Sequence, residues 1–174
     1  MRFIDFLRTT VLLTAGEATA LAAVAILAAA GDEDTTTIIF SLAWWAVAAI
    51  IGAWIGRGSK PSTRIATLLA EAGSSQALPE LTPARVLLNR LWPLGVIALI
   101  AAGSAWVYPQ FSSVAAGYAI LVALSWRKHE AAVTAIEGRD GAQFYVLPTS
   151  PFRGMELVRT PGYHFPTGNG TGPA

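Results

Sequence analysis

Hydrophobic residues along this chain are gathered into four blocks, and polar residues are concentrated in the segments between them. The blocks cover residues 9–30, 38–56, 86–107 and 111–126, and each is apolar nearly all round. A helix in a soluble bundle would instead keep a polar stripe along one face. The first and third blocks have the length of about 20 residues that crossing a bilayer requires, and the other two are slightly shorter. The pattern predicts a mainly α fold, a polytopic membrane protein with four transmembrane helices in two hairpins.

The overall composition points the same way. Of the 174 residues, 53% are hydrophobic and only 13% are charged, whereas soluble domains carry about 25% charged residues. The first block also resembles a secretory signal peptide, but Asp5, Glu17 and the length of the apolar run favour a retained span. We therefore divide the chain into a transmembrane domain (1–127), a small tail (128–165) and a disordered C-terminus rich in Gly, Pro and Thr (166–174).

The positive charges are distributed asymmetrically along the chain. All twelve Lys and Arg residues lie before the first block, between the second block and the first turns of the third, or after the fourth, and the two other connections contain none. Because positively charged segments stay in the cytoplasm, this pattern predicts that both termini and the loop 57–85 are cytoplasmic (N-in/C-in). Four of the cations come at the inner ends of the third and fourth spans, where we expect their side chains to reach the lipid headgroups: Arg85, Arg90, Arg127 and Lys128.

The middle loop and the tail contain shorter elements. In the loop, apolar residues at helical spacing predict an amphipathic helix over 63–72 that lies along the membrane or docks on the ends of the spans. In the tail, β-type runs predict a hairpin of 133–137 with 142–147 and a third strand at 155–159. A competing interpretation continues the fourth span as a helix to Gly138. Since an isolated hairpin is only marginally stable, we expect the tail to dock on the loop, on a second copy or on another protein.

Glu17 is the one carboxylate inside a predicted span. At 1.5 Å per residue counted from Arg8, it lies roughly 10 Å into the hydrocarbon, and no Lys or Arg lies deep inside any span to pair with it. We expect burial to favour the protonated carboxyl. An ionisable residue at this depth is a functional candidate by default.

Two interpretations of Glu17 compete. In the functional one, the carboxyl titrates as a substrate binds and leaves. In the structural one, the protonated carboxyl makes a hydrogen bond to a neighbouring helix and helps to fix helix packing. Besides backbone carbonyls, the neighbouring spans offer four candidate partners for that bond: Asn89, Ser104, Tyr118 and Ser125.

Small residues at two places favour a close approach between helices. Gly16 with Ala20, and Gly52 with Gly56, are pairs of small residues four positions apart. Such pairs let the backbones of membrane helices come together. Gly16, Gly52 and Gly56 are therefore candidate helix-packing contacts.

Four spans with a lone Glu in the first resemble the arrangement of the small multidrug resistance exporters, which are proton-coupled cation antiporters. The resemblance rests on Glu17 and implies that this residue would bind protons and cations. The long middle loop, the tail and the one-sided charge distribution of this chain depart from that family.

Enzyme chemistry is not indicated by the sequence. The chain contains no cysteine, which excludes disulfides and iron–sulfur clusters, and no phosphate-binding, dinucleotide-binding or metalloprotease motif. His129 and His164 lack the spacing of a metal site, and the segment 128–130 is typical of a solvated helix end. We therefore expect no metal, no cofactor and no enzymatic activity.

The sequence leaves two functions to weigh. Arg outnumbers Lys ten to two beside abundant Ala and Gly, which suggests a GC-rich bacterial genome and hence the bacterial inner membrane. We expect a small non-enzymatic scaffold or accessory subunit whose cytoplasmic tail docks on a partner. The alternative is an oligomeric, proton- or cation-coupled small-molecule transporter that uses Glu17. The expected partners are the lipid bilayer and, through the tail, a second copy or another membrane or cytoplasmic protein; no nucleic acid is expected.

Overall fold

The computed structural model describes residues 1–31, 34–57, 63–74, 83–147, 149 and 155–161. Four long helices dominate this part of the chain: α1 (Phe3–Gly31), α2 (Thr35–Gly56), α4 (Pro83–Ser104) and α5 (Pro109–Asp140). Shorter elements are α3 (Thr63–Ala70), β1 (Gly73–Ser74), β2 (Ala142–Val146) and β3 (Leu157–Pro161). Within the described residues, α1, α2 and residues 84–104 of α4 are long and apolar enough to cross a membrane. The predicted mainly helical fold with several apolar helices is thereby confirmed.

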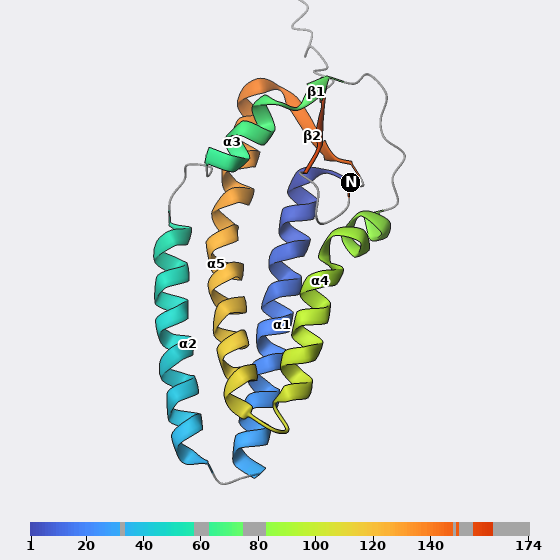
Figure 1. The fold of residues 1–174 in the computed structure, drawn as a ribbon. Helices are drawn as coiled ribbons and strands as arrows, with labels where there is room; N and C mark the ends of the chain where they lie inside the picture. Colours follow the sequence, from blue (N-terminus) through green and yellow to red (C-terminus); the bar gives the residue numbers. More distant parts are fainter. Residues whose placement is uncertain (32–33, 58–62, 75–82, 148, 150–154, 162–174) are drawn as a thin grey trace, which may run out of the picture.

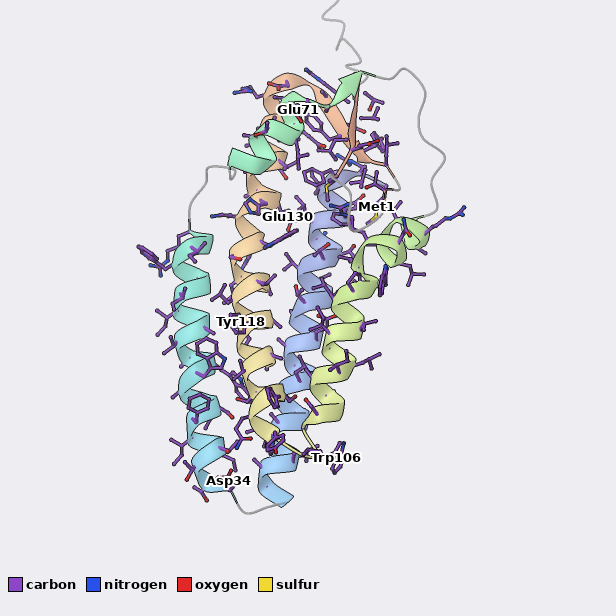
Figure 2. All side chains as sticks on the ribbon, viewed as in Figure 1. Met1, Asp34, Glu71, Trp106, Tyr118 and Glu130 are labelled. Carbon is purple, nitrogen blue, oxygen red and sulfur yellow. The ribbon has the colours of Figure 1, made fainter. Side chains whose placement is uncertain are left out.

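The four long helices form two hairpins, α1 with α2 and α4 with α5, and both hairpins open towards the same end of the molecule (Figure 1). Helices α1 and α4 run away from the end that holds the strands, and α2 and α5 return towards it. Helix α5 packs against both α1 and α2, while α4 packs more sparsely on α1 and α5. Met1 and Glu71 lie at the end with the strands, and Asp34 and Trp106 lie at the opposite end (Figure 2).

Helix α5 is the interior helix, which explains why it is less apolar than the other three. Its polar side chains find partners inside the protein. Ser112 Oγ donates to the Leu21 carbonyl at 2.9 Å, and Ser113 Oγ lies 2.6 Å from Ser41 Oγ. Trp45 Nε1 also donates to the Ser113 carbonyl at 2.9 Å. Because buried polar groups with partners carry little penalty, α5 needs no uniformly apolar surface.

The strands, α3 and the ends of three long helices build a small domain that we call the cap. Strand β3 lies between β1, which is parallel to it, and β2, which is antiparallel, with Val146 opposite Leu157. The chain start adds to the free edge of β2, since Val146 N–H donates to the Met1 carbonyl at 3.0 Å. Apolar side chains from α1, α3, α4, α5 and both longer strands share one core: Phe3, Phe6, Leu7, Leu69, Val86, Val133, Phe144, Val146 and Leu157.

The predicted pairing of 133–137 with 142–147 is wrong. Residues 133–137 belong to α5, which continues to Asp140 and stops where Gly141 adopts a left-handed conformation with φ of 59°. The competing interpretation, a helix through Gly138, describes this segment. Strand β2 pairs instead with residues 157–161, slightly beyond the third strand expected at 155–159. The β-branched run is helical because Val133 is fully buried in the cap core, and tertiary packing overrides local propensity.

The amphipathic loop helix docks on the cap instead of lying free along a membrane surface. It covers 63–70, two residues fewer than the predicted 63–72, and Leu69 is buried in the cap core. Helices α1, α2 and α5 extend beyond their expected blocks, most of all α5, which is 32 residues long. Helix α4 begins and ends three residues earlier than the expected block 86–107. Helix α4 changes direction after its first turns (Figure 1), and Pro93, which removes one backbone donor, lies inside it. The predicted disordered segment 166–174 lies outside the described residues.

Candidate functional site

Glu17 is carried by α1 at the place where α1 faces the middle of α4. Its side chain is partly buried, and among the described residues none forms a hydrogen bond or an ion pair with it. Ser104 and Tyr118, two of the partners expected from the sequence, line the same groove as Glu17 without bonding to it. The interhelical hydrogen bond of the structural interpretation is therefore absent from the described part of the chain.

The other two expected partners are engaged elsewhere. Asn89 Nδ2 donates to the Thr149 carbonyl at 3.1 Å, which ties α4 to the segment after β2. Ser125 Oγ donates to the Val122 carbonyl of its own helix at 3.0 Å. These bonds leave the Glu17 carboxyl without a fixed partner among the described residues.

A long apolar groove extends from Glu17 towards the end of the molecule opposite the cap. It lies between α1, α4 and α5 and has a volume of about 560 Å³. Its walls are mostly aliphatic, with Phe111 and Tyr118 from α5 and Ser104 from α4 among them. We call this groove the longer arm. Its size falls within the range of about 300–1,000 Å³ that is typical of small-molecule sites.

A second groove extends from Glu17 towards the cap. It has a volume of about 240 Å³ and lies between α1 and α4, with Leu87, Trp92 and Gly95 among its lining residues. We call it the shorter arm. Both arms share Thr14, Glu17 and Leu94, so the carboxyl lies where the two arms meet.

The arms lie along the stretch of α4 between its two buried contacts. Near its start, Val86 is buried in the cap core. Near its end, Ala101 packs with Leu21 and Ala116 in a small apolar cluster where α1, α4 and α5 meet. Between these points, no residue from Leu87 to Ile100 is buried. The middle of α4 therefore stands away from α1 and α5 just where Glu17 lies.

The three candidate packing glycines behave differently. A Cβ at Gly52 would lie 3.0 Å from the Leu124 Cβ, and a Cβ at Gly56 would lie 2.5 Å from the Leu124 carbonyl oxygen, so at both positions α2 closely approaches α5. Gly16 is exposed, and a Cβ there would meet nothing within 4 Å. Gly16 is therefore not a helix contact within this chain.

A further close contact, not anticipated from the sequence, holds α2 on α5. A Cβ at Gly117 would clash with Trp44 Nε1, so only glycine leaves room for this ring. The indole N–H of Trp44 donates to the Val114 carbonyl at 3.2 Å. The ring also packs edge-on against Tyr118, with centroids 5.6 Å apart.

The four candidate interfacial cations are spread over the cap-side ends of α4 and α5. Arg85 and Arg127 are exposed. Arg90 donates to the Thr149 hydroxyl at 3.2 Å, and Lys128 Nζ donates to the Ile55 carbonyl at 3.2 Å. Lys128 thus places a positive charge at the C-terminal end of α2, where a helix dipole favours cations. These residues are dispersed and do not converge on one site.

Two buried groups, Glu137 in the cap and His129 below it, were not predicted from the sequence. Glu137 accepts a hydrogen bond from Phe144 N–H at 3.0 Å and forms a 3.1 Å ion pair with Arg2. His129 is buried against Trp126, contrary to the solvated helix end that was expected, and its Nδ1 has no partner. Burial, and then the charge of Lys128, lower the pKa of the His129 imidazole. Nothing local in the sequence signals either environment.

Metal chemistry finds no support in the described residues, where no three His, Cys, Asp or Glu side chains gather into a possible metal site. Comparison of the chain with protein-family models, with curated proteins and with solved structures found no match. The candidate site is therefore defined by its geometry alone: an unpaired carboxyl at the junction of two apolar arms.

Proposed function

We propose that this protein binds a small amphipathic molecule at Glu17 and moves it across a bacterial inner membrane by exchange with protons. The position of Glu17 carries the proposal, because a carboxyl between two apolar arms complements a ligand with a positive charge and an apolar body. An ammonium that pairs with Glu17 requires the ionised carboxyl, so binding to the protonated form releases a proton. This is the transporter that the sequence offered as the alternative function, and the position of Glu17 between the two arms supports it over the scaffold.

The proposal includes four spans with both termini in the cytoplasm. Helix α5 runs alongside the three apolar helices, and all described Lys and Arg residues lie in the cap or at the cap-side ends of the helices. Because the chain has no native cysteine, single substitutions Gly31→Cys and Gly73→Cys report the two sides cleanly. In intact cells, a membrane-impermeant maleimide should label the first and not the second. The reverse pattern would refute this orientation.

Proton release tests the transport function directly. Purified protein in nanodiscs is titrated with hydrophobic amines at weak buffering, and the released protons are followed with a pH dye. The wild type and Glu71→Gln, which removes an exposed carboxyl in the cap region, should release protons in proportion to bound amine. Glu17→Gln should release none while it stays folded. Equal release from Glu17→Gln would show that the carboxyl is not the coupling group.

A scaffold or accessory subunit is the second candidate, and the packing of the cap into one unit favours it. The ion pair of Arg2 with Glu137 and the shared core join the chain start, the middle loop and the tail into one unit. A partner would bind the outer surface of the cap, since Phe144, Val146 and Leu157 of the two strands are buried in its core. Charge reversal at the exposed residues Glu156 and Arg159 should then displace a co-purifying partner, whereas Glu17→Gln should not. The opposite result would favour the transporter.

An oligomer is part of both proposals. Helix α4 leaves most of its surface uncovered within one chain, and four helices enclose little room for a transport path. Light scattering of the detergent-solubilised protein, corrected for bound detergent, gives the number of copies. A mass of one chain would remove the oligomer from the proposal and leave the groove within a single copy.

A further inference from the structure

We propose that the ligand of this groove is a secondary or tertiary amine that carries two apolar substituents of unequal size. This inference rests on the proposed function and specifies its substrate class. It follows from the position of Glu17 between the arms, because a nitrogen paired with the carboxyl has apolar space on two sides.

The charge of the ligand is set by the carboxyl. Glu17 has no partner among the described residues, and no cation of the described part of the chain lies in either arm. A protonated amine supplies both the missing positive charge and an N–H donor, and charge-assisted hydrogen bonds of this kind are short and strong. Secondary and tertiary ammonium ions keep an N–H, whereas a quaternary ammonium has none.

The shape of the ligand is set by the two arms. The longer arm offers about 560 Å³ and the shorter about 240 Å³, and the two meet at Thr14, Glu17 and Leu94. A primary alkylamine paired with Glu17 fills one arm and leaves the other without close contacts. An amine with a long and a short substituent fills both, and it gains the dispersion contacts of the second arm.

The charge balance of binding is simple. The amine is an ammonium ion in water near neutral pH, and in the proposed exchange it meets a Glu17 carboxyl that still carries its proton. Formation of the ammonium–carboxylate pair transfers the carboxyl proton to the solvent, so the groove stays neutral before and after binding. Both amine classes should therefore release protons, and their affinities distinguish the substrate class.

The first experiment compares N-butyloctylamine with dodecylamine, which have the same number of carbons and one nitrogen each. Binding to the purified full-length protein is measured by proton release at equal micelle-bound concentrations. We expect N-butyloctylamine to bind on the order of tenfold more tightly, because filling a preformed apolar subsite discriminates by at least that factor. Equal affinities with release that depends on Glu17 would overturn the two-substituent ligand and leave the proposed function intact. No release from a folded wild type would overturn both.

The second experiment fills the shorter arm. Gly95 lines this arm, and a Cβ at Gly95 meets nothing within 4 Å, so Gly95→Leu adds an apolar side chain without a clash at Cβ. The matched control is Gly103→Leu, which is also on α4, is equally free of contacts and lines neither arm. Gly95→Leu should lower the affinity for N-butyloctylamine to that for dodecylamine, and Gly103→Leu should preserve the preference. An equal loss for both amines in Gly95→Leu, or a preference that survives it, would overturn the inference.

Discussion

The contact between α2 and α5 can be tested by adding one methyl group at each of three glycines. A Cβ at Gly52 would lie 3.0 to 3.2 Å from Leu124 and the Leu121 backbone, and a Cβ at Gly56 would lie 2.5 Å from the Leu124 carbonyl oxygen. Ordinary contact begins at 3.4 Å, so Gly56→Ala requires a separation of about 0.9 Å between two backbones, which cannot rotate away. Gly16→Ala is the control, because its Cβ would meet nothing.

The magnitude follows from two opposing effects. Alanine in place of glycine stabilises a helix interior by up to about 1 kcal/mol, and this gain is common to Gly16→Ala and Gly52→Ala. Overpacking a tight contact costs about 1–3 kcal/mol. We expect Gly16→Ala to raise the free energy of unfolding slightly. Gly52→Ala should be less stable than Gly16→Ala by about 1 kcal/mol, and Gly56→Ala should be the least stable, by an amount towards the upper end of about 1–3 kcal/mol.

Reversible unfolding in mixed micelles, followed by the circular dichroism of the helices and by tryptophan fluorescence, measures these differences. The fluorescence is informative because Trp44 and Trp45 both donate hydrogen bonds to α5. If α2 separates from α5 in Gly56→Ala, the fluorescence should change before the helical signal is lost. Three variants of equal stability would refute the reasoning, since a real close approach cannot accept a methyl group at no cost.

Three further predictions concern the cap, the buried imidazole and the shorter arm. Glu137→Ala should cost about 1–3 kcal/mol in thermal unfolding because it leaves the buried Phe144 N–H unpaired, whereas Glu137→Gln keeps an acceptor and should cost less; equal losses would contradict this. The pKa of His129 is lowered by burial and by Lys128, so its contribution to stability is present above the unfolded-state pKa of about 6.5 and is lost as the pH falls below it. His129→Phe should flatten the unfolding profile below about pH 6.5, and an unchanged slope would contradict the assignment. Gly95→Leu should raise the unfolding temperature relative to the wild type while it lowers binding of N-butyloctylamine, and a lower unfolding temperature would show that the arm is closed to a side chain.

Much of the helical framework could be predicted from the sequence, because long apolar helices can be recognised from their composition. Leu12, Ile39 and Ile97 are exposed on the helix surfaces, and the apolar blocks that contain them need no tertiary information to be recognised. Helix ends were less predictable. Residues 133–137 look like a strand, and they are helical because Val133 enters a core built from four helices and two strands.

Only part of the candidate site could be predicted from the sequence. Glu17 stands out in sequence because it is the one carboxylate of its span, but the arms on either side of it depend on where α4 is anchored. Gly16 and Gly52 have the same local pattern, and only the fold shows that one is exposed and the other touches α5. The buried state of Glu137 depends on Arg2, which is 135 positions away along the chain, and no local signal carries such a pairing.

The sparse packing of α4 beside Glu17 can be explained by the solvent around the helix. In a soluble protein, a helix with no buried residue from Leu87 to Ile100 would lack the apolar contacts that hold it in place. In a bilayer, lipid chains can occupy the space beside it, so there is no hydrophobic force to close the gap between α4 and its neighbours. The groove can therefore remain open until a better-fitting apolar molecule replaces lipid. In the proposed function, the carboxyl at the junction of the arms then selects that molecule, because an amine can pair with the ionised carboxyl and a lipid chain cannot.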